Sequence, residues 1–194
     1  MINLGRTQRS QDRLRAELDT LGTDLETVAQ FVRREDTFLH KTYLEILRNN
    51  PPICTFPALI KPCRVLLTEI GFSLPETTAV EKRIAGYLIP AGTIVIMDTQ
   101  RLNKTSPVWG TDGDIFRPER WDTITTQQAR YSFLGYGMGP RKCLGKNVAN
   151  VIIKLFLVAI VQRFELQAGT GATQIKRDRF TCMPEEMVSF RPRA

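Results

Sequence analysis

The sequence predicts a mainly α-helical fold with small β-sheets, an α+β protein that forms one domain over residues 1–194. A composition of 42% hydrophobic and 24% charged residues is typical of a soluble globular protein. Apolar residues recur at helical spacing in several stretches, whereas β-type runs are short and lie in the middle and at the end of the chain. A chain of 194 residues is long enough to bury a core.

Two amphipathic helices are predicted in the first quarter of the chain. Residues 12–21 place three leucines on one helical face before a glycine ends the helix; these residues are Leu14, Leu18, Leu21 and Gly22. From Glu35 to Asn50, pairs of apolar residues recur every four positions. Pro51 and Pro52 stop this second helix because proline lacks a backbone N–H.

The middle of the chain is predicted to hold a small sheet followed by an irregular segment. β-type runs cover residues 64–67 and 84–97, and Pro90-Ala91-Gly92 is the expected turn between two strands of the second run. Residues 101–130 show little periodicity. Long segments of this kind persist when they are functional or tightly packed, so we expect this one to carry a role.

The last third of the chain is predicted to contain a buried helix between a loop and two strands. A glycine-rich stretch, residues 135–145, leads into a helix from about Leu144 to Arg163 that is apolar on nearly every side. A helix that is apolar all round is expected to be buried. Short strands with a turn between them follow at 164–167 and 187–190.

Charge and patterning exclude several classes of protein. Lys and Arg number 27 against 20 Asp and Glu, a net charge of +7. The basic residues do not cluster as in nucleic-acid-binding proteins, so an acidic protein surface is the favoured partner and no nucleic acid is expected. The polar first ten residues lack a signal-peptide pattern. The longest apolar stretch, 148–161, contains Asn150 and Lys154 and falls short of the roughly 20 residues of a membrane span.

The cysteines do not form a framework. Cys54, Cys63, Cys143 and Cys182 have no repeating spacing, which excludes a zinc site built from paired Cys-x-x-Cys elements. Cys54 and Cys63 can pair in principle, but the expectation is a reduced intracellular chain with buried thiols.

One thiol, Cys143, lies where the glycine-rich stretch meets the apolar helix. Gly135, Gly137 and Gly139 are spaced two apart and no Gly-Lys-Ser/Thr follows, which excludes the Rossmann and Walker loops. At a helix start, free backbone N–H groups and the helix dipole favour a thiolate that can bind a metal. Small neighbours allow a flat cofactor to approach, and Arg141 can neutralise an acidic group on it. The alternative is an inert cysteine at a helix start.

Residues 136–145 read Tyr-Gly-Met-Gly-Pro-Arg-Lys-Cys-Leu-Gly, which resembles the cysteine-ligand loop of the cytochrome P450 haem-thiolate monooxygenases. The family usually has Phe where this chain has Tyr136, whose phenolic oxygen either hydrogen bonds near the thiolate or points away. Residues 45–48, Glu-Ile-Leu-Arg, resemble the family's Glu-x-x-Arg helix, and residues 116–121, Phe-Arg-Pro-Glu-Arg-Trp, resemble its Pro-x-Arg-aromatic segment. The three motifs follow the family order, and the resemblance extends over nearly the whole chain.

Glu45 and Arg48 are three residues apart on the predicted helix and therefore share one face. If Arg120 joins them, the three charges form a buried network that ties the irregular segment to the helix behind the cysteine loop. The alternative is an exposed ion pair that contributes little to stability. We interpret Trp109 as a core aromatic and His40 as packed or solvent-facing rather than as a ligand.

The resemblance implies haem, iron protoporphyrin IX, as the cofactor and the Cys143 thiolate as the axial ligand of its iron. It implies Arg141, and as a secondary candidate Arg64, as the contacts of a haem propionate. The cofactor-binding loop would also include Tyr136, Gly137, Gly139 and Gly145. The implied reaction is monooxygenation of a small organic substrate with electrons from an NADPH-dependent reductase. The reductase would dock on a positively charged face of this chain formed by Lys142, Lys146 and Arg130. The alternative is that these residues are scattered, solvated charges.

The loop resembles the fungal microsomal branch of the family, which includes enzymes of secondary metabolism. This implies an intracellular protein, associated with the endoplasmic reticulum membrane if the full-length protein carries the family's anchor. The chain corresponds to the C-terminal part of the fold, a partial domain that we expect to lack the oxygen-activating helix and any catalytic residue. Two alternatives remain, a non-catalytic haem-binding fragment or pseudoenzyme and a basic interaction module without a cofactor.

Overall fold

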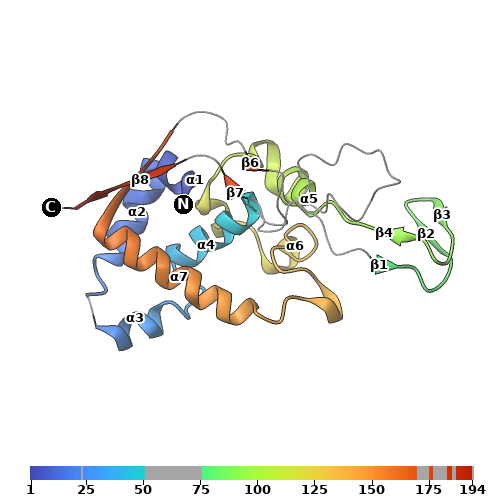
Figure 1. Cartoon of the computed structure of the whole chain (residues 1–194), viewed down its shortest axis with the longest axis horizontal. Coiled ribbons are helices and arrows are strands. Elements are labelled where there is room, and N and C mark those ends of the chain that lie inside the picture. The colour runs from blue at the N-terminus through green and yellow to red at the C-terminus, as the bar shows by residue number, and fades with distance from the viewer. Residues whose placement is uncertain (23, 51–75, 170–174, 177–182, 185–186, 194) are drawn as a thin grey trace.

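The computed structural model describes residues 1–22, 24–50, 76–169, 175–176, 183–184 and 187–193. Helices form most of the body and the strands are short, so the predicted mainly α fold with small β-sheets is confirmed (Figure 1). The strand predicted at 64–67 and the helix stop at Pro51 lie outside the described residues.

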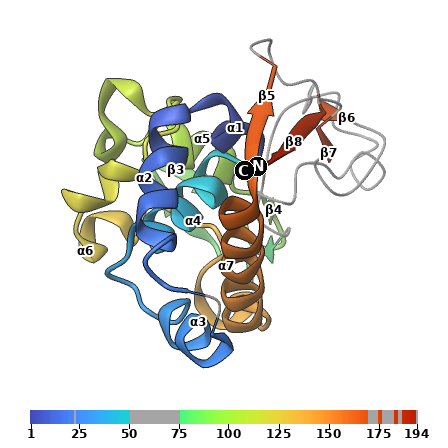
Figure 2. The same ribbon diagram turned by 90° about the vertical axis from the view of Figure 1, so that its left-hand side faces the viewer.

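Three helices pack against one another around the core: α2 (Gln8–Leu18), α4 (Phe38–Asn49) and α7 (Lys146–Arg163). Figure 2 shows the three side by side, with α3 (Leu25–Phe31) at one end of the group. All three helices contribute buried side chains to one cluster, which includes Leu14, Leu18, Leu39, Tyr43, Leu157, Val158 and Val161. The core therefore lies between the two predicted N-terminal helices and the long apolar helix.

The two helices predicted before Pro51 are confirmed, with different ends. α2 begins at Gln8 rather than at residue 12, and its Leu14 and Leu18 are fully buried as predicted. α4 begins later than predicted because Thr37 caps it: the Thr37 hydroxyl accepts the backbone N–H of His40 at 3.1 Å. α1 (Ile2–Arg6) and α3 were not predicted, because such short helices show no repeat of apolar residues.

Two side chains of α2 bind backbone groups of neighbouring elements. The Glu17 carboxylate accepts the N–H groups of Phe38 and Leu39, each at 2.8 Å, and so satisfies free donors at the start of α4. The buried Gln11 amide donates to the carbonyl of Leu166 at 3.0 Å and accepts the N–H of Leu166 at 2.7 Å. Leu166 belongs to β5 (Phe164–Ala168). Polar groups of α2 therefore fix the positions of α4 and β5.

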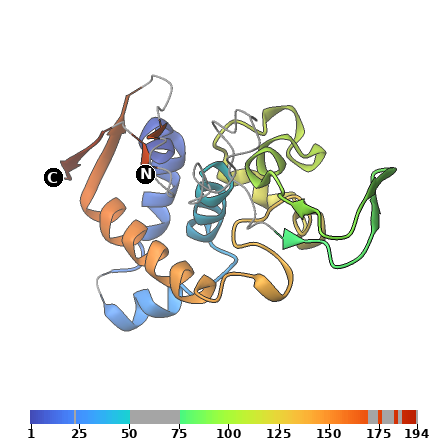
Figure 3. The ribbon, with the colours of Figure 1, turned by 45° about the vertical axis from the view of Figure 1, so that its right-hand side comes forward.

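The described strands pair antiparallel in four two-stranded sheets. β5 pairs with β8 (Val188–Pro192), which confirms the two strands predicted near the end of the chain. The other pairs are β1 (Glu76–Thr77) with β4 (Ile94–Val95), β2 (Lys82–Ile84) with β3 (Tyr87–Ile89), and β6 (Ile175–Lys176) with β7 (Met183–Pro184). The β2–β3 hairpin extends away from the helical body (Figure 3).

The predicted turn at Pro90-Ala91-Gly92 is confirmed as a turn between two strands, although these two strands do not pair with each other. It links β3 to β4, and each of these strands pairs with a different partner. The hairpin turn lies instead at Ala85 and Gly86, which have φ values of 50° and 87°. Two consecutive residues with positive φ match the twist of a two-residue hairpin. Alanine seldom adopts this conformation, which is why the sequence did not reveal the turn.

The segment predicted to be irregular consists largely of short helices. They are α5 (Thr99–Thr105), the 3₁₀ helices η1 (Pro107–Asp112) and η2 (Pro118–Asp122), and α6 (Thr126–Ala129). Each is too short to show a period of apolar residues, and a proline begins each 3₁₀ helix. The segment packs against α4 through α5 and η2.

α7 is buried on one side only, contrary to the prediction from its apolar composition. Leu157, Val158 and Val161 are buried, whereas Val148 and Phe156 are each 64% exposed. Lys154 is fully buried, and its Nζ donates to the backbone carbonyls of Val32 at 2.9 Å and Arg34 at 3.0 Å. The apolar composition of α7 favours burial, but the described residues of this chain leave one of its faces exposed. None of the described helices is long and apolar enough to cross a membrane.

Candidate functional site

Glu45 and Arg48 of α4 and Arg120 of η2 meet in one buried charge network. The Arg48 guanidinium donates to both carboxylate oxygens of Glu45, from Nε at 2.9 Å and from Nη2 at 2.7 Å. Arg120 Nε donates to Glu45 Oε1 at 2.9 Å. All three side chains are buried, so the alternative of an exposed ion pair does not describe this site.

The remaining donors of the two arginines are bound by backbone carbonyls. Arg48 donates to the carbonyls of Asn103 at 2.7 Å and Gly113 at 2.5 Å. Arg120 donates to those of Trp109 at 3.2 Å and Asp112 at 3.0 Å, and both arginines donate to that of Ile115. Because every carbonyl lies in the segment from α5 to η2, the network holds that segment against α4. Buried charges are tolerated when they are paired and fully hydrogen bonded in this way.

Three further groups, none of them predicted from the sequence, bind the Glu45 carboxylate. Trp121 Nε1 donates to Oε2 at 3.0 Å, the backbone N–H of Arg117 donates to Oε1 at 3.0 Å, and the Asn49 amide donates to Oε1 at 3.2 Å. The Pro-x-Arg-aromatic motif contains Trp121, but nothing in the spacing indicates that the indole is a donor to Glu45. The predicted core position of Trp109 is confirmed, since this residue is buried and its ring lies edge-on to that of Trp121.

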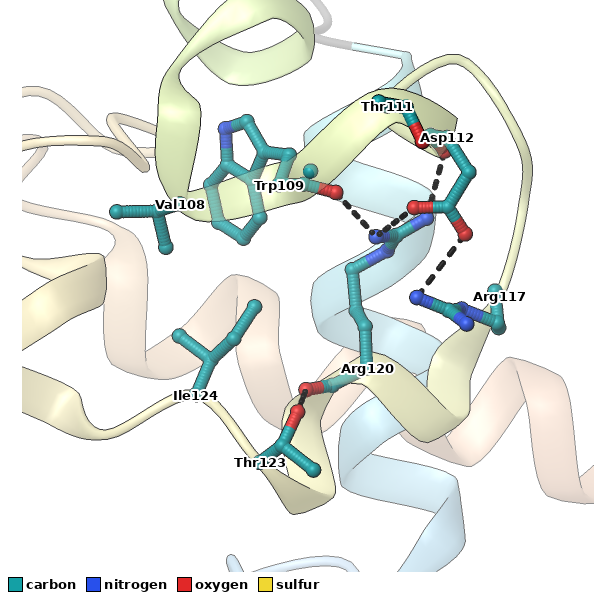
Figure 4. Close-up of a pocket in the computed structure, with 9 residues that line it drawn as sticks. Val108, Trp109, Thr111, Asp112, Arg117, Arg120, Thr123 and Ile124 are labelled. Atoms are coloured by element: carbon teal, nitrogen blue, oxygen red, sulfur yellow. Dashed lines mark hydrogen bonds and ion pairs between the residues drawn. The ribbon is translucent and has the colours of Figure 1, made fainter.

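The cavity in Figure 4 lies beside this network, with a volume of about 490 Å³. Asp112, which lines it, binds Arg117 at 2.9 Å and also lies 3.4 Å from Arg120. Its lining comes from η1, η2 and the residues that follow them, namely Val108, Trp109, Gly110, Thr111, Asp112, Arg117, Arg120, Thr123 and Ile124. None of these residues belongs to the cysteine loop, so this cavity is separate from the loop that carries Cys143.

The cysteine loop, residues 135–145, presents the Cys143 thiol on the surface. Cys143 is free and exposed, and it lies three residues before the first residue of α7. Its backbone N–H donates to the carbonyl of Tyr136 at 2.9 Å, which closes the loop. Gly137 and Gly139 have φ values of 72° and 73°, a conformation that side chains other than glycine rarely adopt. A Cβ added at Gly139 would meet no atom within 4 Å, so the loop borders open space there.

Four contacts hold the first residues of this loop and the residues just before it. Ser132 shares a hydroxyl hydrogen bond of 2.7 Å with Ser106. The ring of Phe133 lies edge-on to Trp121, with the ring centroids 5.3 Å apart. The N–H of Leu134 donates to Oδ1 of the buried Asn103 at 3.0 Å, and Tyr136 binds Tyr43 of α4. The loop is therefore tied to the charge network through Trp121 and Asn103.

The Tyr136 hydroxyl points to α4. It accepts the hydroxyl hydrogen of Tyr43 at 2.8 Å, so it forms a bond with the helix that carries Glu45. Burial and donation to Tyr136 together raise the pKa of Tyr43 well above its usual range.

His40, one turn before Tyr43, is partly buried, and desolvation with the charge of Lys154 lowers its pKa to about 4. Of the two positions predicted for His40, packed or solvent-facing, the structure shows a partly buried, packed one.

The other predicted site residues differ in what the structure says of them. Arg141 lies in η3 (Gly139–Arg141), two residues before Cys143. Gly145 precedes α7, and a Cβ added there would lie 3.9 Å from the Cys143 sulfur. Arg64 lies outside the described residues. Within the described residues, no three His, Cys, Asp or Glu side chains gather in a way that could hold a metal ion.

A family model described as cytochrome P450 matches residues 1–189. The chain belongs to the cytochrome P450 family. Over 194 residues it is 36% identical to the cytochrome P450 monooxygenase lepD of Aspergillus flavus, covering 98% of this chain and 35% of that protein. It is 34% identical to the cytochrome P450 monooxygenase opdB of Penicillium oxalicum, covering 91% of this chain and 33% of that protein. This P450 chain therefore spans about a third of the length of these relatives.

Solved P450 structures share the fold. The structure described as retinoic acid bound cyanobacterial CYP120A1 superposes with a TM-score of 0.74 at 22% sequence identity, covering 97% of this chain and 40% of that one. The predicted family and fold class are both confirmed by these comparisons.

The residues of the loop fit the haem that the family implies. Haem is a flat, largely apolar group with acidic substituents and an iron that binds a soft thiolate. The loop offers an exposed free thiol beside the open space at Gly139. Apolar side chains are exposed near it, among them Met138, Leu144 and Val148. A single thiol, with no cluster of further ligands among the described residues, suits a porphyrin iron, because the porphyrin supplies four nitrogen ligands.

Proposed function

We propose that this chain is the cysteine-ligand part of a haem-thiolate monooxygenase, with Cys143 as the axial ligand of the haem iron. The observation that carries the proposal is the exposed, free Cys143 thiol on a loop whose start is fixed to a buried charge network. A ligand must be held in place to define the geometry at the metal. Thiolate-ligated haem supplies the chemistry that cleaves O₂ and inserts one oxygen atom into an organic substrate.

The chain's own residues position and balance the cofactor in this proposal. Arg141 binds a haem propionate through a charge-assisted hydrogen bond, and Arg64 is the secondary candidate for the same role. Gly137 and Gly139 keep the loop surface free of side chains, which allows close approach of the flat ring. Glu45, Arg48 and Arg120 act at a distance by fixing the segment on which the loop rests.

The partners follow from the same proposal. A small organic substrate and an NADPH-dependent reductase complete the reaction, and Lys142, Lys146 and Arg130 provide positive charge for an acidic reductase surface. Lys142 and Arg130 are exposed, which supports this role. The resemblance of the loop to the fungal microsomal branch leads us to propose a substrate of secondary metabolism and an intracellular site, at the endoplasmic reticulum membrane if the full-length protein carries the family's anchor.

The test is the reduced, CO-bound spectrum of the purified chain after haem addition, compared with Cys143→Ser. We expect a thiolate-type Soret band in the wild type and its loss in the variant, while the far-ultraviolet circular dichroism of the two proteins stays alike. Cys54→Ser and Cys182→Ser are the matched controls and should keep the band. The same band in Cys143→Ser would overturn the ligand assignment, and no haem uptake at all would favour an interaction module without a cofactor.

Turnover separates an enzyme from a fragment that only binds haem. This chain and a version extended upstream through any in-frame coding sequence would be assayed with reductase, NADPH and candidate substrates for oxygenated product. We expect product from the extended version, because a porphyrin has two faces and this chain offers the ligand for one of them. Haem binding without product from either version would favour a pseudoenzyme.

A further inference from the structure

Tyr136 makes two hydrogen bonds, one with the backbone of Cys143 and one with a side chain of helix α4. Its backbone carbonyl accepts the N–H of Cys143 at 2.9 Å, and its hydroxyl accepts the hydroxyl hydrogen of Tyr43 at 2.8 Å. One residue thus joins the backbone of the ligand cysteine to helix α4. The partner on α4 is two residues before Glu45, so the connection begins next to the charge network.

Tyr43 is held on more than one side. Its side chain is 1% exposed, and the Lys154 ammonium lies 5.7 Å from the centroid of its ring. Two backbone carbonyls fix that ammonium in turn, those of Val32 and Arg34. The ring of His40 lies 5.8 Å away on the same helix. Because these contacts fix the ring, the Tyr43 hydroxyl is a donor at a set position rather than a mobile group.

The two hydroxyls differ in what they lose when the bond is broken. Tyr43 is the donor and is buried, so without an acceptor its O–H has no access to water. Tyr136 is the acceptor and is only partly buried, so its oxygen can be solvated. An unpaired buried donor carries the full cost of desolvation, whereas loss of both partners of a buried hydrogen bond can be nearly neutral.

We infer that Tyr43 is a positioning residue for Cys143, acting through the Tyr136 hydroxyl, and that the two tyrosines work as a single unit. The unit holds the carbonyl that binds the Cys143 N–H and thereby sets where the thiol lies. Its relevance to haem ligation rests on the proposed function, but the coupling between the two hydroxyls and the Cys143 backbone does not.

The two tyrosines therefore predict an unequal and non-additive set of variants. Tyr136→Phe leaves the buried Tyr43 donor unpaired and disturbs the loop most. Tyr43→Phe leaves the Tyr136 oxygen to water and disturbs it less. The double variant Tyr43→Phe/Tyr136→Phe removes both hydroxyls, keeps both rings, and restores behaviour close to the wild type.

The first measurement is amide hydrogen exchange at Cys143 in the full chain without haem. We expect exchange about tenfold faster in Tyr136→Phe, a smaller increase in Tyr43→Phe, and a rate within about twofold of the wild type in the double variant. Tyr131→Phe is the matched control, since Tyr131 is 64% exposed and close to the loop, and it should exchange like the wild type. Additive increases, with the double variant worst, would overturn the coupling.

The second measurement is the fraction of thiolate-type Soret absorbance in the reduced, CO-bound state after haem addition, in the same order of variants. A wild type without haem uptake overturns the proposed function and leaves the exchange result to decide the coupling. A wild type with the thiolate band and variants that match it overturns the positioning role alone. If Tyr136→Phe fails to fold, recovery of folding in the double variant supports the coupling, and failure of the double variant as well overturns it.

Discussion

The charge network around Glu45 has partners within the chain for its charged groups, whereas the outward face of α7 leaves apolar side chains uncovered. Every charged group of the network has partners within the chain, and its three charged side chains are buried. On α7, apolar side chains of the outward face remain open to solvent, among them Val148, Ile152 and Phe156. The charge network therefore needs no partner from outside the chain, whereas the outward face of α7 has the apolar composition of a protein interior. The cysteine loop connects them, since it is held by one region and leads into the other.

The largest effect we expect comes from a substitution that disrupts the charge network. Arg48→Ala removes the bidentate partner of Glu45 and leaves its carboxylate with fewer charges to offset its burial. We expect a loss of about 3–5 kcal/mol in the free energy of unfolding, measured by urea denaturation, and insoluble or haem-free protein in cells. Glu45→Ala should behave in the same way.

Arg34→Ala is the matched control for that experiment. Arg34 pairs with Asp36 at 2.6 Å, but both side chains are largely exposed, so the change should lower the free energy of unfolding far less than Arg48→Ala does. Equal losses in Arg48→Ala and Arg34→Ala would mean that burial does not distinguish the two ion pairs.

Neighbouring residues of α7 sharpen the comparison within one helix. Leu157 is 2% exposed and Phe156 is 64% exposed, so these neighbouring side chains lie on a buried and an exposed face of the same turn. Leu157→Ala should lower the free energy of unfolding by about 2–5 kcal/mol because it opens a cavity in the core. Phe156→Ala should change it by less than about 0.5 kcal/mol. A large loss in Phe156→Ala would show that this face is covered.

His40 makes the stability of the folded protein depend on pH. Burial and nearby lysines lower its pKa from 6.5 to about 4 in the folded protein. Between these two pH values the unfolded chain binds a proton that the folded chain does not, so stability falls as the pH drops from 6.5 towards 4. We expect His40 to account for about 2 kcal/mol of this loss, allowing for its partial exposure. Urea denaturation of the wild type and His40→Gln at about pH 7 and about pH 5 measures it. Equal losses in both proteins would assign the effect to other groups.

Among the variants expected to destabilise the protein, Trp121→Phe should have the smallest effect. The variant loses one donor to Glu45, while the phenyl ring can still pack between Trp109 and Phe133. Because the carboxylate keeps its arginine partners, we expect a loss of about 1 kcal/mol in the free energy of unfolding. A loss as large as that of Arg48→Ala would mean that the indole, rather than the guanidinium, controls the network.

The parts of the site that the sequence predicted are those with local patterns. Glu45 and Arg48 are three residues apart on one helix, and residues 136–145 form a continuous motif. Asn103 and Trp121 contribute through contacts with residues far away in the chain, such as the N–H of Leu134 and the carboxylate of Glu45. No spacing in the sequence encodes those contacts.

The fold shows the same limit. α2 and α4 have repeats that reveal their faces, while α1 and α3 are too short to do so. Lys154 interrupts an apolar run in the sequence, yet it is buried because the carbonyls of Val32 and Arg34 bind its ammonium. Apolar composition predicted that α7 favours burial on all sides, but composition does not say which surface provides the cover.

The contact between Gln11 and Leu166 has a consequence for self-association. β5 pairs with β8 along one edge, and the N–H and carbonyl of Leu166 are turned towards Gln11. Here the Gln11 amide uses one N–H donor and its oxygen acceptor, the same pair of groups that a residue of a neighbouring strand would offer. Gln11 therefore occupies the place of a third strand at this residue, and α1 packs against the same strand. Exposed strand edges recruit strands from other molecules and lead to aggregates. Gln11 and α1 thus cover the edge of β5, where a further strand would otherwise add to this small sheet.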